Sequence, residues 1–158
     1  MAARKQPPRD GHARPPDALP AEGTQAERHR SARVARASIL MEDYVELIDD
    51  LVATGGEARP TDIARRMGVS HATAIAAIAR AKSAGFATSR PYRGVFLTAE
   101  GRDLAARVRA RHRVVVDLLV AVGVPPAVAE TDAEGIEHHV SDVALSAFER
   151  FLARERGE

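Results

Sequence analysis

The sequence predicts a mainly helical protein with one small β-hairpin, divided into a winged helix-turn-helix domain and a C-terminal helical domain. Three observations support this fold class. Apolar residues recur at helical spacing from Ser38 onward, a helix-turn-helix pattern precedes two short extended runs, and a long helix follows from Gly101. We expect residues 1–30 to form a tail, 31–100 the first domain and 101–158 the second.

The charge of the chain is nearly balanced, at +1, but its distribution is not. Residues 57–113 contain twelve Lys and Arg against four Asp and Glu, whereas residues 114–158 contain three against nine. A basic stretch suits a nucleic-acid partner, and an acidic one suits cations.

Cysteine is absent, which excludes thiolate metal sites and fits a reducing cytoplasm. No run approaches the ~18 apolar residues of a membrane span. The basic N-terminus is not followed by the apolar segment of a secretory signal. We therefore expect a cytoplasmic protein without membrane contact.

The tail and the first helix differ sharply in composition. Residues 1–30 hold five of the nine prolines and few large apolar side chains, which predicts disorder. From Ser38 a helical stripe begins and runs until Gly55-Gly56; its members are Leu40, Tyr44, Leu47, Ile48 and Leu51. Asp43, Glu46 and Asp50 form a second, acidic stripe, which taken alone is ordinary solvated charge.

The helix-turn-helix pattern consists of a helix near Thr61–Met67, a turn at Gly68-Val69 and a helix over about 70–83, closed by Gly85. We expect Thr61 to cap the first helix. A small core between the two helices would contain Ile63, Ala64, Met67, Val69, Ala74, Ile75 and Ile78. A plain helical hairpin is the alternative.

The second helix would be the recognition helix of a DNA-binding unit. Ser70, His71 and Thr73 would reach base edges from its first turn, and Arg80 and Lys82 would contact phosphates. The extended runs of residues 86–98 predict a hairpin, which in this position is a wing. Arg90 and Arg93 at its tip would contact phosphate or the minor groove.

The long helix from Gly101 to about Val122, with Thr98 as its N-cap, is rich in arginine in its first half and almost entirely apolar in its second. That apolar half predicts burial in a subunit interface, and hence a homodimer. A short helix over about 126–131 and a final helix from about Glu134 to Arg154 follow. The final helix carries a second apolar stripe, which we expect to join the same interface.

The final segment also carries Glu134, Glu137 and His138 at positions i, i+3 and i+4. In a helix these side chains share one face and can reach a common cation; the alternative is a solvated helix face. Asp43, Glu46 and His112 supply further oxygen and imidazole donors. Such a set without sulfur suits hard six-coordinate ions, manganese above all.

Three motifs extend this interpretation: Met-Glu-Asp-Tyr-Val-Glu at 41–46, Tyr-Arg-Gly-Val-Phe-Leu-Thr-Ala-Glu-Gly at 92–101, and Asp-Ala-Glu-Gly-Ile-Glu-His-His at 132–139. Together they make residues 38–153 resemble the diphtheria toxin repressor family of metal-dependent transcriptional repressors, in its manganese-responsive branch.

The resemblance implies a manganese-activated repressor of manganese transport genes that binds double-stranded operator DNA as a homodimer. It implies two Mn²⁺ per chain, with other divalent metals possible. The implied ligands are Asp43, Glu46, His112, Glu134, Glu137 and His138. Iron-responsive relatives carry sulfur-bearing residues where Asp43 and Glu134 stand, so these oxygens favour manganese. His139 would have a structural role.

Three other functions would share parts of this pattern. Activation by iron or zinc would use the same ligands. A winged-helix regulator of an organic ligand would leave the carboxylates and histidines unexplained. A two-metal hydrolase would need an open cleft and substrate-binding groups. The sequence offers no further acid–base set for such a site. We therefore expect no enzymatic activity.

Overall fold

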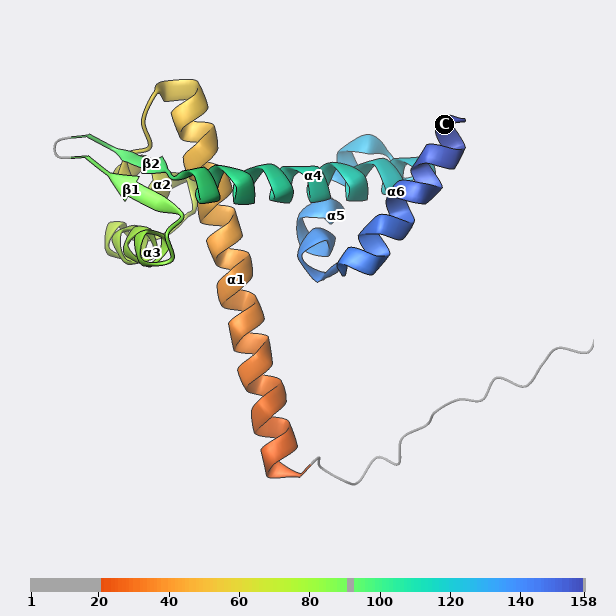
Figure 1. Cartoon of the computed structure of the whole chain (residues 1–158), viewed down its shortest axis with the longest axis horizontal. Helices are drawn as coiled ribbons and strands as arrows, with labels where there is room; N and C mark the ends of the chain where they lie inside the picture. The colour runs from red at the N-terminus through yellow and green to blue at the C-terminus, as the bar shows by residue number, and fades with distance from the viewer. Residues whose placement is uncertain (1–20, 91–92, 158) are drawn as a thin grey trace, which may run out of the picture. The chain divides into compact units, whose positions relative to one another are not determined.

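The computed structural model describes residues 21–90 and 93–157, which divide into two compact units at Val34 and Ala35. Within these ranges the chain is mostly helical, with one two-stranded antiparallel sheet, as the sequence predicted (Figure 1). The elements are α1 (Glu22–Gly55), α2 (Pro60–Arg66), α3 (His71–Ser83), β1 (Ala87–Ser89), β2 (Val95–Leu97), α4 (Ala99–Ala121), α5 (Pro126–Ile136), the 3₁₀ turn η1 (Glu137–His139) and α6 (Asp142–Arg156).

Helix α1 begins at Glu22, well before the predicted start at Ser38. The prediction of a disordered tail is therefore wrong for residues 22–30, while residues 1–20 lie outside the described part of the chain. Residues 22–38 are all exposed and consist largely of Ala, Glu, Gln and Arg. These residues favour helix intrinsically. They produce no apolar stripe, and apolar periodicity therefore predicts no helix there.

The helix-turn-helix is present, with two local differences from the prediction. The prediction of Thr61 as the cap of α2 is wrong, because Pro60 takes the first helical position and Arg59 precedes it without a side-chain cap. The next helix, α3, does have a side-chain cap: Ser70 Oγ accepts a hydrogen bond from the Thr73 amide at 3.1 Å. Ile75 is 45 % exposed and so is not part of the predicted core.

One apolar core joins α1, α2, α3 and the hairpin. Its fully enclosed side chains include Val45 and Ile48 of α1, Ile63 of α2 and Ala74 of α3. Strand β2 pairs with β1 in the register Ala87↔Leu97 and also bridges Ala58, whose carbonyl accepts from the Val95 amide at 2.7 Å. The predicted wing is therefore attached to the loop between α1 and α2 as well as to α3.

The start of α4 is tied to the base of the wing. Thr98 caps the helix as predicted, accepting from the Gly101 amide at 3.1 Å, and its hydroxyl donates to the Gly85 carbonyl at 2.7 Å. A Cβ on Gly101 would lie 2.0 Å from the Phe86 carbonyl oxygen, so only glycine fits there. This close approach fixes where the long helix leaves the winged domain.

Helices α5 and α6 both pack on α4. The predicted continuous final helix is wrong. Helix α5 runs on to Ile136, the chain makes one 3₁₀ turn, and α6 begins only after Ser141, whose side chain caps it. The Ser141 cap and the extended Val140 provide the local reason for the break.

The core of this C-terminal half is small. Its buried apolar side chains include Val108, Val115, Ala129, Ala133 and Leu152. Large apolar side chains remain exposed there, namely Val120, Val122, Val128, Ile136 and Val143. No helix in the described ranges is both long and apolar enough to traverse a bilayer.

Candidate metal centre

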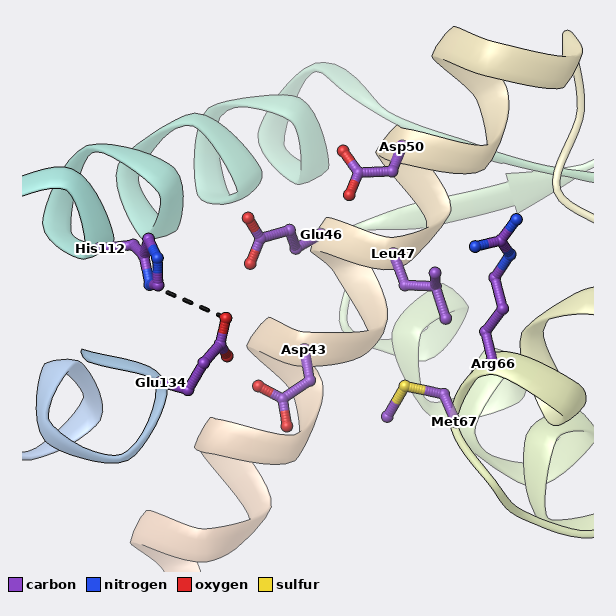
Figure 2. A pocket seen from close by; sticks show the side chains of 8 residues that line it. All are labelled: Asp43, Glu46, Leu47, Asp50, Arg66, Met67, His112 and Glu134. Carbon is purple, nitrogen blue, oxygen red and sulfur yellow. Dashed lines mark ion pairs between the residues drawn. The ribbon is translucent and has the colours of Figure 1, made fainter. Parts of the chain in front are cut away.

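The six predicted ligands come from four elements of the unit formed by residues 35–158. Asp43 and Glu46 lie on α1, His112 on α4, Glu134 on α5, and Glu137 and His138 in η1. Four of them line an open pocket of about 600 Å³, where Asp43 and Glu46 face His112 and Glu134 (Figure 2). Residues separated by almost a hundred positions in sequence are thus brought to one place.

The acidic motif does not present its three donors on one helix face, contrary to the prediction. The Glu134 side chain, in the last turn of α5, is 74 % exposed. Glu137 and His138, in the 3₁₀ turn, are almost completely buried. The 3₁₀ turn directs the Glu137 carboxylate and the His138 imidazole inward, toward α1 and α4.

Glu137 lies between the two imidazoles. Its Oε2 is 2.5 Å from His112 Nδ1, and its Oε1 is 3.6 Å from His138 Nε2. Glu134 Oε1 is 3.9 Å from the same His112 nitrogen, along the dashed line in Figure 2. Asp43 Oδ1 is 3.4 Å from His138 Nε2. Five of the predicted ligands therefore form one connected cluster.

Glu46 is the member with a different partner. It lines the same pocket, but its nearest charged neighbour is Arg109 of α4, at 3.7 Å. Arg109 also contacts Asp49 at 2.8 Å and Asp50 at 2.7 Å. This arginine, which sequence reasoning did not single out, pairs with the acidic side of α1 next to the cluster.

The pKa values of three carboxyl groups are raised above their ordinary range. Burial is the main cause for Asp43, Glu46 and Glu137. The His138 charge partly opposes it at Asp43, as Arg109 does at Glu46 and His112 at Glu137. Burial lowers the pKa of His112, but hydrogen bonds to Glu130 and Glu137 outweigh it and leave that pKa raised. The cluster thus holds more negative charge than its surroundings stabilise.

In residues 21–90 and 93–157, no three His, Asp or Glu side chains are already arranged to enclose a metal ion. The donors bond one another directly instead, as the short contact between His112 and Glu137 shows. By donor type the cluster fits a divalent cation, because half-buried carboxylates and imidazoles without sulfur suit hard ions. A cation would have to replace these mutual contacts.

The predicted DNA-contacting residues are all exposed. The hydroxyls of Ser70 and Thr73 are hydrogen-bonded to each other at 2.8 Å. Lys82 donates to Ser89 Oγ of the wing at 2.8 Å. The Arg90 guanidinium lies 5.7 Å from the Phe96 ring centre, and Arg93 is 3.9 Å from Glu57. His71 and Arg80 complete the set on α3.

Two family models match consecutive parts of this chain. Residues 38–95 match the iron dependent repressor N-terminal DNA binding domain, and residues 98–155 match the iron dependent repressor metal binding and dimerisation domain. Among curated proteins, the transcriptional regulator MntR of Escherichia coli O157:H7 is 46 % identical over 133 residues, which are 84 % of this chain and 86 % of that protein.

The chain belongs to the iron-dependent repressor family. The MntR of Salmonella typhimurium is 49 % identical over 125 residues, 79 % of this chain and 80 % of that protein. A protein of this family is a metal-dependent, DNA-binding transcriptional regulator and not an enzyme, as the sequence predicted.

Solved structures of the family agree with the fold. IdeR of T. acidophilum is 30 % identical with a TM-score of 0.61, over 70 % of this chain and 53 % of that one. A structure described as a manganese-dependent transcriptional repressor in complex with manganese is 29 % identical with a TM-score of 0.61, over 70 % of this chain and 51 % of that one. This chain spans about half the length of both.

Sequence reasoning missed two carboxylates that contact the histidines of the cluster. Glu42 lies 3.2 Å from His138 Nδ1, and Glu130 lies 3.0 Å from His112 Nε2. Glu42 adjoins Asp43 in sequence, and Glu130 is one turn before Glu134. Nothing in their spacing distinguished them from ordinary surface charge.

Proposed function

We propose that this chain is a manganese-activated repressor that binds double-stranded operator DNA as a homodimer and controls manganese transport genes. The relatives named MntR and the repressor solved with manganese support the choice of metal. The sulfur-free donor set supports it independently. We take residues 31–100 as the DNA-binding domain and 101–158 as the metal-binding and dimerisation domain.

Two metal ions per chain would be held by the six clustered donors: Asp43, Glu46, His112, Glu134, Glu137 and His138. The observation that carries this assignment is the position of buried Glu137, with an imidazole on each side and Asp43 beyond one of them. A carboxylate with two oxygens between two imidazoles suits a pair of neighbouring sites. When bound, the metal supplies positive charge to a cluster in which burial raises three carboxyl pKa values.

The structure of α1 couples this cluster to the DNA-binding unit. Asp43 and Glu46 point toward the cluster, while Tyr44, Val45 and Ile48 of the same turns are buried in the core shared with α2 and α3. Drawing Asp43 and Glu46 toward α4 and η1 therefore constrains the unit that carries the recognition helix. In a dimer this would favour a spacing of two recognition helices near ~34 Å, one turn of DNA.

The test is an operator-binding titration with Mn²⁺, Fe²⁺, Zn²⁺ and Ca²⁺, combined with metal stoichiometry per chain. We expect Mn²⁺ to activate binding with about two ions per chain. Because binding linkage is reciprocal, operator DNA must tighten Mn²⁺ binding by the factor by which Mn²⁺ tightens DNA binding. Equal Mn²⁺ affinity with and without operator would rule out the coupling.

Glu134→Ala should abolish the metal response of operator binding, because this exposed carboxylate faces His112 without contributing to the core. Glu155→Ala, in the last turns of α6, is the matched control and should leave the response intact. A regulator that sensed an organic ligand instead would bind operator equally in both variants, with no dependence on metal.

A further inference from the structure

Each histidine of the cluster uses its two ring nitrogens on opposite sides. His138 Nε2 faces the predicted ligands Asp43 and Glu137, at 3.4 and 3.6 Å. Its Nδ1 lies 3.2 Å from Glu42 Oε2. At His112 both ring nitrogens are within hydrogen-bond distance of a carboxylate. There Nδ1 faces Glu137 at 2.5 Å and Glu134 at 3.9 Å, and Nε2 lies 3.0 Å from Glu130.

Glu42 is held in place from a second side. The Arg111 guanidinium of α4 lies 3.4 Å from the same Oε2 that His138 contacts. The Glu42 side chain is only 15 % exposed, so this three-residue chain of Arg111, Glu42 and His138 is largely shielded from water. Glu42 contacts the ring nitrogen of His138 opposite the one that faces Asp43 and Glu137. It therefore lies behind the histidine and not among the donors.

A neutral imidazole has one N–H and one lone pair, and the hydrogen bond at one nitrogen decides which of them the other presents. A carboxylate can only accept, and Glu42 lies closer to Nδ1 than Asp43 or Glu137 lies to Nε2, so in the neutral ring Nδ1 carries the proton. The lone pair of His138 is then on Nε2, facing Asp43 and Glu137. Carboxylates behind metal-binding histidines orient the ring in this way and increase its basicity.

We propose that Glu42 is a positioning residue that keeps His138 protonated at Nδ1, so that Nε2 is free to bind a divalent cation. Glu130 contacts the outer nitrogen of His112 but does not decide the tautomer of that ring, because Glu137 lies closer to Nδ1. This inference rests on the proposed function, because it takes both histidines as metal ligands. It adds the nitrogen through which His138 binds and a further carboxylate that sets the affinity of that histidine.

The two pairs differ in strength. The Glu42 and His138 side chains are only 15 % and 7 % exposed, whereas the Glu130 side chain is 64 % exposed. A hydrogen bond shielded from water contributes more than an exposed one. Replacement of Glu42 should therefore weaken metal binding more than replacement of Glu130.

The first measurement is the tautomer of His138 in the metal-free protein, read from ¹⁵N NMR shifts of the ring at about pH 8.5, where an ordinary histidine is neutral. A neutral imidazole in water favours Nε2–H, so Nδ1–H at His138 is diagnostic. We expect Nδ1–H in the wild type and a return to Nε2–H in Glu42→Ala. Glu42→Gln, whose amide oxygen still accepts, should retain Nδ1–H.

The second measurement is Mn²⁺ affinity, from the electron paramagnetic resonance signal of free Mn²⁺. Loss of such a carboxylate weakens metal binding about 10–100-fold, which we expect for Glu42→Ala, with a smaller loss for Glu42→Gln and Glu130→Ala. Glu57→Ala is the control. It removes another partly buried carboxylate, which accepts from the Gly94 amide, far from the cluster in sequence, and should change neither the tautomer nor the affinity.

Three results would overturn the inference. A wild-type His138 that carries its proton on Nε2 would contradict the hydrogen bond from Nδ1 to Glu42. Unchanged Mn²⁺ affinity in Glu42→Ala, with only a lower melting temperature, makes Glu42 purely structural. Loss of one bound Mn²⁺ in Glu42→Ala with Nδ1–H preserved makes Glu42 a ligand. Failure of the proposed function is distinct, because the His138 and His112 ring signals of the wild type would then not respond to Zn²⁺, used as a diamagnetic probe.

Discussion

Glu137 is the one charged residue among the described residues whose side chain is buried with the core, at 2 % exposure. Burying a carboxylate is costly unless it is paired, and here the partners are two imidazoles. The pairing leaves the pKa of Glu137 raised, mainly by burial, and the pKa of His112 raised by its hydrogen bonds in spite of burial. Burial thus disfavours the charged form of Glu137, which is the form that a metal ion binds.

Competition between protons and a metal ion predicts a pH dependence of the metal response. The pKa of His112 is above its ordinary value of 6.5, so the ring begins to protonate above that pH as the pH falls. Metal binding requires the neutral ring, and Mn²⁺ affinity should therefore decrease as the pH falls through this range. Mn²⁺ titrations from about pH 8.5 to 6 measure it. An affinity that stays constant over this interval would exclude His112 as a ligand.

A second prediction at the residue scale compares two isoleucines of the helix-turn-helix. Ile63 is fully buried and Ile75 is 45 % exposed, although their sequence pattern suggested the same core. Ile63→Ala should lower the free energy of unfolding by about 2–5 kcal/mol, because it leaves a cavity. Ile75→Ala should change it by less than about 0.5 kcal/mol. Denaturant unfolding distinguishes them, and equal losses would place Ile75 in the core after all.

Among the elements, α1 and α4 decide how the molecule is organised. Helix α1 supplies core residues to the winged unit and carboxylates to the cluster. Helix α4 starts at the base of the wing and carries His112, Arg109 and Arg111 toward α1. The two helices are joined by ion pairs between Arg109 and Asp49 or Asp50. The position of α4 depends on the close approach at Gly101.

Gly101→Ala tests that approach. The added Cβ would meet the backbone of Phe86 at 2.0 Å, which backbone movement alone can relieve. We expect a loss of about 1–3 kcal/mol in unfolding free energy, as for other overpacked sites. Gly135→Ala is the control, because it is also helical and has nothing within 4 Å of its Cβ. It should stabilise the helix by about 0.5–1 kcal/mol. A Gly101→Ala variant as stable as wild type would contradict the packing.

In the unit formed by residues 35–158, burying the carboxylates of the cluster without a metal ion lowers the stability of the fold at neutral pH. Because the pKa values of Asp43, Glu46 and Glu137 are raised in the fold, folding favours their protonated forms. Their contribution to stability is therefore present below their ordinary values of 3.8 and 4.5 and is lost as the pH rises through the folded values. A bound cation at neutral pH would offset this loss.

Glu137→Gln should separate stability from metal binding. At neutral pH the amide removes the buried charge, so the metal-free variant should unfold no more easily than wild type. Wild type at a Mn²⁺ concentration of 100 times its Kd should gain about 2.7 kcal/mol, and the variant should gain far less. Thermal unfolding with and without Mn²⁺ measures both effects. A metal-induced gain of wild-type size in the variant would remove Glu137 from the ligand set.

The C-terminal half has a small core and several exposed valines, which accords with the dimerisation domain that its family model describes. Apolar side chains that one chain cannot bury are typical of surfaces that a second subunit covers. The prediction of an interface from the apolar half of α4 rested on the same physical reason. Val120 and Val122 at the end of that helix are indeed exposed in the single chain.

The sequence by itself determined the helix-turn-helix, the hairpin, the cap Thr98, and the identity of the candidate donors. These depend on local chemistry, such as periodicity, turn residues and side-chain caps, which neighbouring positions reveal. The early start of α1 was missed because a helix without an apolar face has no periodicity to detect.

Only the tertiary structure decided how the donors meet. It divides the acidic motif between α5 and a 3₁₀ turn, places Glu137 between two imidazoles, and sets Glu42 and Glu130 behind them. Glu42 and His138 are 96 positions apart, and no local pattern encodes a contact over that distance. Such pairings follow from the packing of α1, α4 and α5 around one another, which is a property of the folded chain.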